Sequence, residues 1–158
     1  MIEQHNKLTG RLMKRRSETE ENQVALKGGT RFAVRFEDVF PSGCVMGADT
    51  IVSKVIDFDK RGKLDDQDID KVTGERVWAV RVMDLDPDLE GRPREVVIKI
   101  SAPIQPIPPV GAFQPVEFDG LTVTPWVNDK GRMQYSIRAT AILAPETIAE
   151  KRARQAAA

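Results

Sequence analysis

A tryptophan and an arginine stand in polar rows of two neighbouring strand-like segments, where they could hold a nucleic acid. Trp126 shares its row with Thr122 and Thr124, and Arg138 shares the matching row with Ser136. An exposed tryptophan can stack on a nucleobase, which contributes about 1 to 3 kcal/mol per base. A nearby arginine supplies phosphate contacts and cation–π attraction. These residue types predict a nucleic-acid-binding surface around Trp126 and Arg138.

Three further residues on or beside predicted strands could extend this surface: Arg132, Arg76 and Trp78. Trp78 also has a second interpretation, because apolar residues surround it on both sides and a tryptophan in such a run can fill a small core. Both interpretations stay open for Trp78 and for Trp126.

The N-terminal segment, residues 1–29, is polar, charged and without a strand pattern, and its last two residues, Gly28 and Gly29, form a natural linker. Lys14, Arg15 and Arg16 give it a basic cluster that could meet phosphates. Two interpretations stay open: a disordered tail, or a helix or arm that orders on DNA or on a partner.

The residue types that catalysis needs are scarce. Cys44 is the single cysteine and stands in the apolar run GCVMGA, so we predict a small buried side chain. The single histidine, His5, lies in the N-terminal segment. The sequence contains neither a phosphate-binding glycine loop nor a dinucleotide fingerprint. We therefore predict a protein that is not an enzyme, with no catalytic residue, no cofactor and no metal site.

Two acidic stretches, 57–70 and 84–90, invite a calcium or an acid–base interpretation. In the first, Arg61 occupies a ligand position of an EF-hand-like loop and Asp68 replaces its terminal glutamate. The second has no nucleophile beside it. Both are predicted to be solvated acidic loops, and the second keeps a sheet edge soluble.

The segment 117–140 predicts the β-hairpin that would present Trp126 and Arg138. Two alternating runs flank the polar loop NDKG, residues 128–131, which is typical of a hairpin connection. Pairing Val127 with Met133 leaves five residues between the strands, and an odd count keeps the apolar rows on one face. Gly131 is expected in the left-handed conformation, which costs glycine little.

Four more strands are predicted before the hairpin, and they fall in residues 30–37, 44–58, 76–84 and 95–102. In the first, Phe32, Val34 and Phe36 alternate with polar residues. In the second, which is long, Gly47 marks a bulge or bend. The segment 102–115 carries five prolines and is predicted to be a stiff connection without strand or helix.

Five or six strands and no buried helix predict an all-β fold, with a small OB-like barrel as first choice and a β-sandwich as the alternative. The barrel domain is expected to span 30–145, between the N-terminal extension 1–29 and an alanine-rich, flexible or helical tail, 146–158. A chain of 158 residues that is 41% apolar has room for one such core.

The charge balance and the cysteine content limit the functions and the cellular compartment that the sequence allows. The chain carries 24 basic and 24 acidic side chains and therefore has no net charge. Any phosphate-binding surface must be a local cluster of basic residues. A single cysteine fits a reducing compartment. No apolar run approaches the roughly 20 residues of a membrane span, and no signal peptide is recognisable. We expect a cytoplasmic protein without membrane contact.

Five segments together resemble the plasmid replication, integration and excision activator family of actinobacterial integrative and conjugative elements. They are FEDVFPSG (36–43), DKVTGERVWAVRVMDLDP (70–87), QPIPP (105–109), FQPVEFDGLTVTPWVND (113–129) and YSIRATAI (135–142). The resemblance implies a non-enzymatic accessory regulator that promotes replication, excision and integration of a mobile element. It implies no residue-level site.

Three functions stay open at this point. The first is a DNA-associated activator that uses the hairpin face and the N-terminal arm. The second is a single-stranded-DNA-binding OB-fold protein. The third is a protein adaptor without DNA affinity, for which the proline-rich segment 103–115 could serve as the partner surface. The expected partners are therefore DNA, single- or double-stranded, the element's replication or recombination proteins, and a second copy of the chain.

Overall fold

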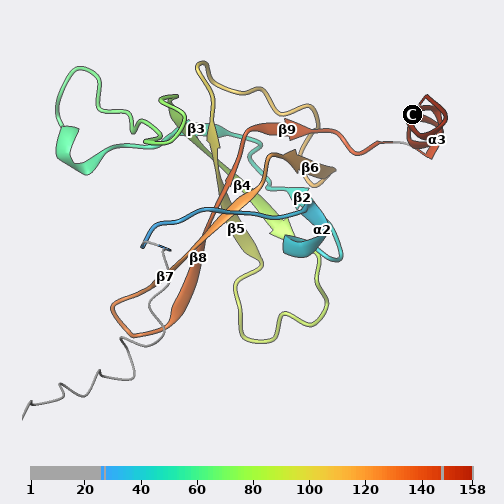
Figure 1. The fold of residues 1–158 in the computed structure, drawn as a ribbon, viewed down its shortest axis with the longest axis horizontal. Coiled ribbons are helices and arrows are strands. Elements are labelled where there is room, and N and C mark those ends of the chain that lie inside the picture. Colours follow the sequence, from blue (N-terminus) through green and yellow to red (C-terminus); the bar gives the residue numbers. More distant parts are fainter. Residues whose placement is uncertain (1–25, 27, 147, 158) are drawn as a thin grey trace, which may run out of the picture.

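The computed structural model describes residues 26, 28–146 and 148–157, which form a curled, mixed β-sheet with few helices (Figure 1). The strands of this described part are β1 (Phe32–Ala33), β2 (Cys44–Met46), β3 (Val52–Lys54), β4 (Val77–Asp84), β5 (Glu95–Ser101), β6 (Pro115–Asp119), β7 (Thr122–Val127), β8 (Met133–Ala139) and β9 (Ala141–Leu143). The helices are α2 (Phe36–Val39), the 3-10 turn η1 (Phe58–Lys60) and α3 (Ile148–Ala156). The all-β prediction is confirmed.

The strand order brings the chain's two halves together. β4 pairs with β2, β3 and β5, and all three ladders are antiparallel. β5 pairs on its other side with β8 in parallel. β8 then pairs with β7, while β2 pairs with β6 and β6 with β9. Because β6 leads directly into β7 and β8 into β9, the sheet curls round into a half-barrel.

The prediction of five or six strands was wrong in number, because the sheet has nine strands in the part that the structure describes. The excess arises where predicted long strands are broken. The range 44–58 divides into β2 and β3, and each run of the C-terminal hairpin divides into two strands.

The first break follows Gly47. Its N–H donates to the carbonyl of Arg81 at 3.0 Å, and an added Cβ would lie only 3.1 Å from that oxygen. Thr50 then takes the left-handed conformation, with φ of 48°, before β3 begins. The bend predicted at Gly47 is confirmed, and it ends the strand rather than only deforming it.

The second break lies at Gly120 and Thr140, which face each other across the hairpin. Both the backbone N–H and the hydroxyl of Thr140 donate to the carbonyl of Asp119, at 2.9 and 3.2 Å. Gly120 has φ of 61°, and a Cβ there would overlap the Thr140 side chain. This contact turns both hairpin strands at one corner.

The predicted strand at 30–37 was mostly wrong. β1 has two residues, and the chain then forms the short helix α2. Phe36, Val39 and Phe40 have the i, i+3, i+4 spacing of a helix and pack on the core. At the start of the helix, the backbone N–H and the guanidinium of Arg35 donate to the carboxylate of Asp38.

Other sequence predictions are confirmed. β4 and β5 occupy the predicted ranges 76–84 and 95–102, and the connection 102–114 contains neither strand nor helix. Val127 lies opposite Met133 in the hairpin, and Gly131 has φ of 72°. The tail forms α3.

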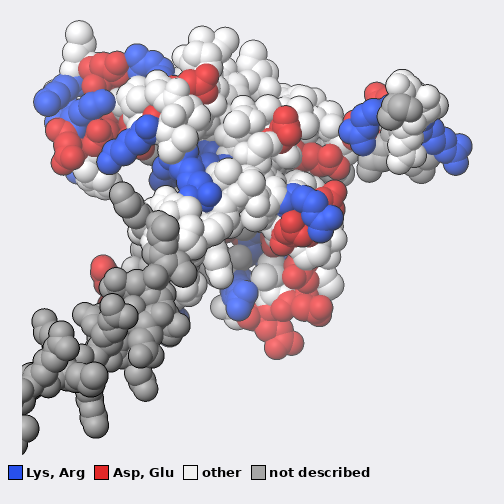
Figure 2. All heavy atoms as spheres, viewed as in Figure 1, with Lys and Arg blue, Asp and Glu red and all other residues white. Residues whose placement is uncertain are grey.

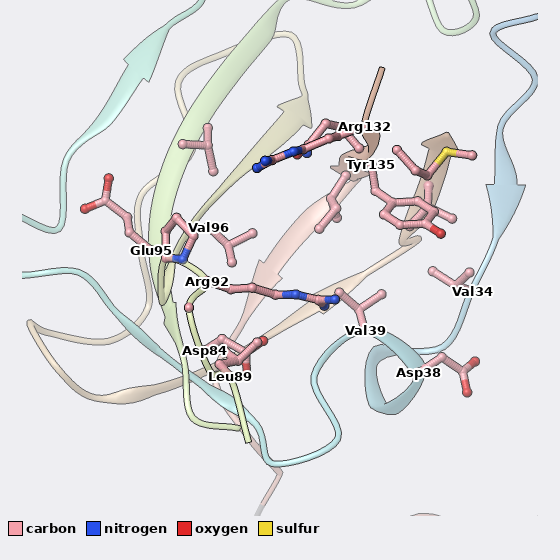
Figure 3. A pocket seen from close by; sticks show the side chains of 17 residues that line it. Val34, Asp38, Val39, Asp84, Leu89, Arg92, Glu95, Val96, Arg132 and Tyr135 are labelled. Atoms are coloured by element: carbon pink, nitrogen blue, oxygen red, sulfur yellow. The ribbon is translucent and has the colours of Figure 1, made fainter. Parts of the chain in front are cut away.

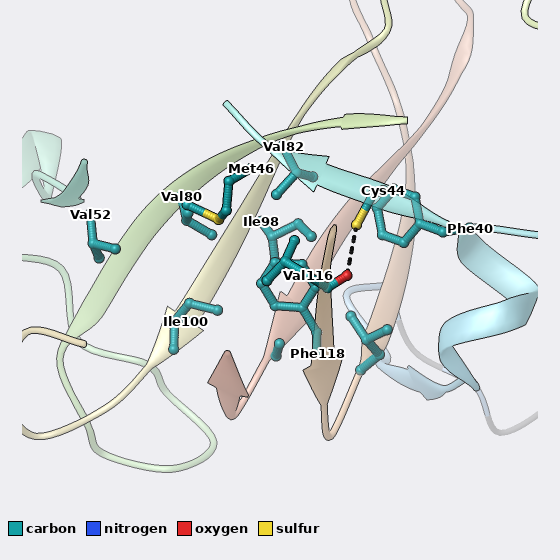
Figure 4. Packing of buried hydrophobic residues seen from close by; sticks show 12 residues of the cluster. Phe40, Cys44, Met46, Val52, Val80, Val82, Ile98, Ile100, Val116 and Phe118 are labelled. Carbon is teal, nitrogen blue, oxygen red and sulfur yellow. Dashed lines mark hydrogen bonds between the residues drawn. The ribbon is translucent and has the colours of Figure 1, made fainter. Parts of the chain in front are cut away.

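The core fills the interior of the curled sheet (Figure 4). It is built from alternate residues of the central strands, which point to the same face of the sheet. Its members with less than 6% exposure include Met46, Val80, Val82, Ile98, Ile100, Val116 and Phe118. The outward-facing residues of β4, β5, β7 and β8 are therefore free to form a surface.

Candidate nucleic-acid interface

The outer face of the β7–β8 hairpin carries the predicted polar row. The register places Thr122 opposite Arg138, Thr124 opposite Ser136 and Trp126 opposite Gln134. Half of the surface of Trp126 is exposed. The structure thus presents Trp126 and Arg138 on neighbouring strands of one face, at opposite ends of the hairpin.

A shallow groove of about 420 Å³ connects this hairpin with β5. Its lining residues are Val97, Lys99, Trp126, Tyr135, Ser136 and Ile137. Trp126 and Lys99 therefore border the same hollow, one as an aromatic surface and the other as a cation. This combination suits an unpaired nucleotide, whose base can stack while its phosphate meets the ammonium.

Three basic residues gather where β5 and β8 pair. Lys99 lies beside Arg138 in the parallel register. Arg31 approaches from the segment before β1, and its Nη1 lies 2.9 Å from the carboxylate of Asp70. Arg138 Nη1 lies 3.5 Å from the same carboxylate. Figure 2 shows basic side chains gathered near the middle of the face where these strands cross in Figure 1.

Asp70 holds this cluster in place. Its side chain is 1% exposed, and it accepts hydrogen bonds from Ser101 Oγ and from the backbone N–H groups of Val72 and Thr73. Burial acts to raise its pKa, but the hydrogen bonds from Ser101, Val72, Arg31 and Thr73 outweigh burial and hold the pKa at about 2. Asp70 is therefore ionised at neutral pH.

The positive charges of Lys99 and Arg138 are incompletely neutralised by the acidic side chains around them. Burial lowers the pKa of Lys99, and the nearby charge of Arg138 lowers it further. Burial likewise lowers the pKa of Arg138, and Arg31 adds to the effect. Arg138 Nη1 is buried and has no hydrogen-bond partner in the described part of the chain. An anion beside Lys99 and Arg138 would relieve this repulsion.

The other predicted site residues do not join this cluster. Trp78 packs against the core and donates its indole N–H to the carbonyl of Ala102 at 3.0 Å. Arg76 forms a bidentate ion pair with Asp65, which lies in the 55–76 loop. Arg132 lies at the hairpin turn and lines a separate cavity. Lys14, Arg15 and Arg16 lie outside the described residues.

Sequence reasoning missed the partners that come from distant segments. Arg31, Asp70 and Ser101 precede Arg138 by long stretches of chain, and no local pattern connects them. Lys99 alone had a usable signal, because it occupies an outward position between Ile98 and Ile100 of an alternating strand.

The free cysteine, Cys44, is buried. Burial raises the pKa of the Cys44 thiol to about 12, with smaller contributions from Asp84 and Glu117. The thiol lies 3.5 Å from the carbonyl of Val116. Within residues 26, 28–146 and 148–157, no three metal-ligating side chains come together, and no helix is long and apolar enough to cross a membrane.

Comparisons with known proteins assign no family to this chain. No family model, no curated protein and no solved structure matches this chain.

Proposed function

We propose that this protein is a non-enzymatic DNA-binding accessory protein that holds single-stranded DNA on the outer face of β5, β7 and β8. The observation that carries the proposal is the neighbouring pair of Lys99 and Arg138, two partly desolvated cations, of which Lys99 lines a groove that Trp126 also borders. Phosphates would meet the two cations, and a base would stack on Trp126.

An OB-like barrel is the proposed fold, and the pairing order supports it. Three pairs of strands can each be counted as one bent strand: β2 with β3, β6 with β7, and β8 with β9. With β4 and β5 this gives five strands along the chain. Around the sheet they pair in the order first (β2–β3), second (β4), third (β5), fifth (β8–β9) and fourth (β6–β7), and the fourth pairs again with the first. OB folds bind oligonucleotides on the face of their second and third strands, which here are β4 and β5. The 55–76 loop and the hairpin turn 128–132 would flank that face.

Single strands are the proposed ligand because the basic surface is small. A duplex binder needs a broad positive field along two phosphate backbones. Here the cations are few, and acidic side chains occupy the 84–90 loop (Figure 2). A local aromatic and basic groove fits one flexible strand better.

The resemblance described above supports an element-level role for this activity. On that basis we propose that the protein assists replication, excision and integration of a mobile element, in the cytoplasm and beside that element's own proteins.

Fluorescence anisotropy tests the proposal. Labelled oligo(dT) and a duplex of equal length are titrated with the protein over a salt series. We expect oligo(dT) to bind more tightly than the duplex and to weaken as salt rises, because phosphate binding releases counterions. Trp126→Ala and Lys99→Gln are each expected to weaken binding about tenfold. Arg152→Gln, an exposed change on α3 outside the strands and loops of the proposed face, serves as the control.

Two results would reject the proposal. Equal loss with the Arg152→Gln control would show that the groove has no special role. No binding of either DNA at low salt would leave the adaptor function, and the search would move to a protein partner.

A further inference from the structure

β5 and β8 separate from each other at one end of the sheet. Each strand has seven residues, but they pair only over Ile98–Ile100 and Ile137–Ala139. Before these residues the strands diverge, and a cavity of about 940 Å³ opens between them, the 89–93 loop and α2 (Figure 3). This volume is in the range of ligand-binding clefts.

The walls of this cleft are unpaired strand edges. Asn128 N–H donates to the carbonyl of Arg132, so the even-numbered residues of β8 bond to β7 and the odd-numbered ones point away from it. Met133 and Tyr135 therefore direct their backbone N–H and C=O groups toward β5. On the opposite wall the hydrogen bond from Asp84 N–H to Arg94 O places the backbone of Glu95 likewise toward the cleft.

No described strand pairs with β8 at Met133 and Tyr135 on the cleft side. An open edge of this kind is a template for another extended chain. The floor of the cleft is apolar and includes Val96, Val123 and Ile137. Every second side chain of an added strand would face that floor.

Two arginines give the cleft its charge. The guanidinium groups of Arg92 and Arg132 extend into it, while Glu95 and Asp38 point away (Figure 3). A third acidic lining residue, Asp84, accepts a hydrogen bond from the backbone N–H of Asp86 at 3.0 Å. Glu95 lies 3.7 Å from Arg81, and Asp38 is paired with Arg35. Neither Arg92 nor Arg132 has a side-chain partner among the described residues, so both are available to a carboxylate.

We propose that this cleft binds an extended acidic peptide of a partner protein, which adds as a strand beside β8. Its backbone would pair with Met133 and Tyr135, its apolar side chains would fill the floor, and its carboxylates would meet Arg92 and Arg132. A peptide fits better than a nucleic acid because the walls offer backbone N–H and C=O groups that an added strand can pair with. The proposal is independent of DNA binding on the outer face.

A peptide-display selection tests the proposal. A random 12-residue library is selected on the full chain, with counter-selection on the double variant Arg92→Glu/Arg132→Glu. We expect enriched peptides in which aspartate or glutamate alternates with apolar residues. Synthetic peptides of this kind should bind the double variant at least tenfold more weakly, whereas the charge-matched control Lys63→Glu/Arg152→Glu should bind normally.

Amide hydrogen exchange then identifies the mode of binding. Bound peptide should slow exchange at the amides of Met133 and Tyr135, because strand addition gives those groups partners. The proposal is overturned if selection enriches no acidic–apolar peptide, if bound peptide leaves these two amides unprotected, or if oligo(dT) displaces the peptide and itself requires Arg92 and Arg132.

Discussion

Arg138 lies 3.5 Å from the carboxylate of Asp70, yet its buried Nη1 makes no hydrogen bond in the described part of the chain. Arg31 holds the same carboxylate more closely, at 2.9 Å. One buried acid therefore positions two arginines, and the second keeps an unsatisfied N–H inside the protein. Removing one partner of such a buried pair is more costly than the pair's own net contribution.

Asp70 should make the protein acid-sensitive. Its pKa is lower in the folded protein than in the unfolded chain, so its contribution is complete above pH 5 and is lost as the pH falls toward 2. We expect the wild-type free energy of unfolding to fall by about 2 kcal/mol from this group by pH 2. Urea unfolding of wild type and Asp70→Asn across this pH range measures the difference.

At neutral pH the Asp70→Asn variant should be less stable by about 3 kcal/mol, because both arginines lose their counter-charge. Its stability should then depend less on pH than that of wild type. Asp129→Asn, at an exposed turn position, is the control and should keep the wild-type slope. Parallel pH profiles for wild type and Asp70→Asn would contradict this account.

The corner at Gly120 should tolerate no side chain. Gly120→Ala would place a Cβ against Thr140 in a left-handed conformation, and we expect a loss of about 3 kcal/mol or more in the free energy of unfolding. Gly131→Ala is the matched control, because Gly131 is also left-handed but has open space around it. It should lose only about 1 to 2 kcal/mol. Equal losses in urea titrations would show that the contact with Thr140 has no effect.

The Cys44 thiol should be unreactive in the native protein. It is 2% exposed, and burial raises its pKa to about 12, so almost no thiolate forms at pH 8. We expect a disulfide reagent such as DTNB to label it slowly in buffer and completely within seconds in denaturant. Rapid labelling without denaturant would show that β2 opens readily.

The two tryptophans should report different surroundings. Iodide should quench Trp126, which is half exposed, far more than Trp78, whose indole N–H is bonded inside the protein. The single-tryptophan variants Trp78→Phe and Trp126→Phe separate the two signals. Added oligo(dT) should protect Trp126 alone, and protection of Trp78 instead would move the binding surface away from the hairpin.

The central strands and the hairpin could be predicted because their signals are local. Alternation over 76–84 and 95–102 specifies which side chains face the core, and the odd loop between Val127 and Met133 fixes the hairpin register. The breaks were harder to predict. Gly120 is recognisable as a glycine, but its corner depends on Thr140, which meets it only in the folded sheet.

The helix α2 shows a different kind of error. Phe32, Val34 and Phe36 suit a strand, whereas Phe36, Val39 and Phe40 suit a helix, and the two patterns overlap at Phe36. The capping interaction between Arg35 and Asp38 and the packing of Phe40 in the core select the helix. A short segment can satisfy both the two-residue period of a strand and the 3.6-residue period of a helix, so tertiary contacts decide which of the two forms.

The sequence by itself determined the all-β class and the hairpin, because alternation, turn residues and register act over a few neighbouring positions. The tertiary structure alone decided that Arg31, Lys99 and Arg138 gather around Asp70, that Trp78 belongs to the core and that β5 and β8 separate into a cleft. These features depend on which strands become neighbours. That choice reflects the burial of side chains from the whole sheet at once, which no short stretch of sequence encodes.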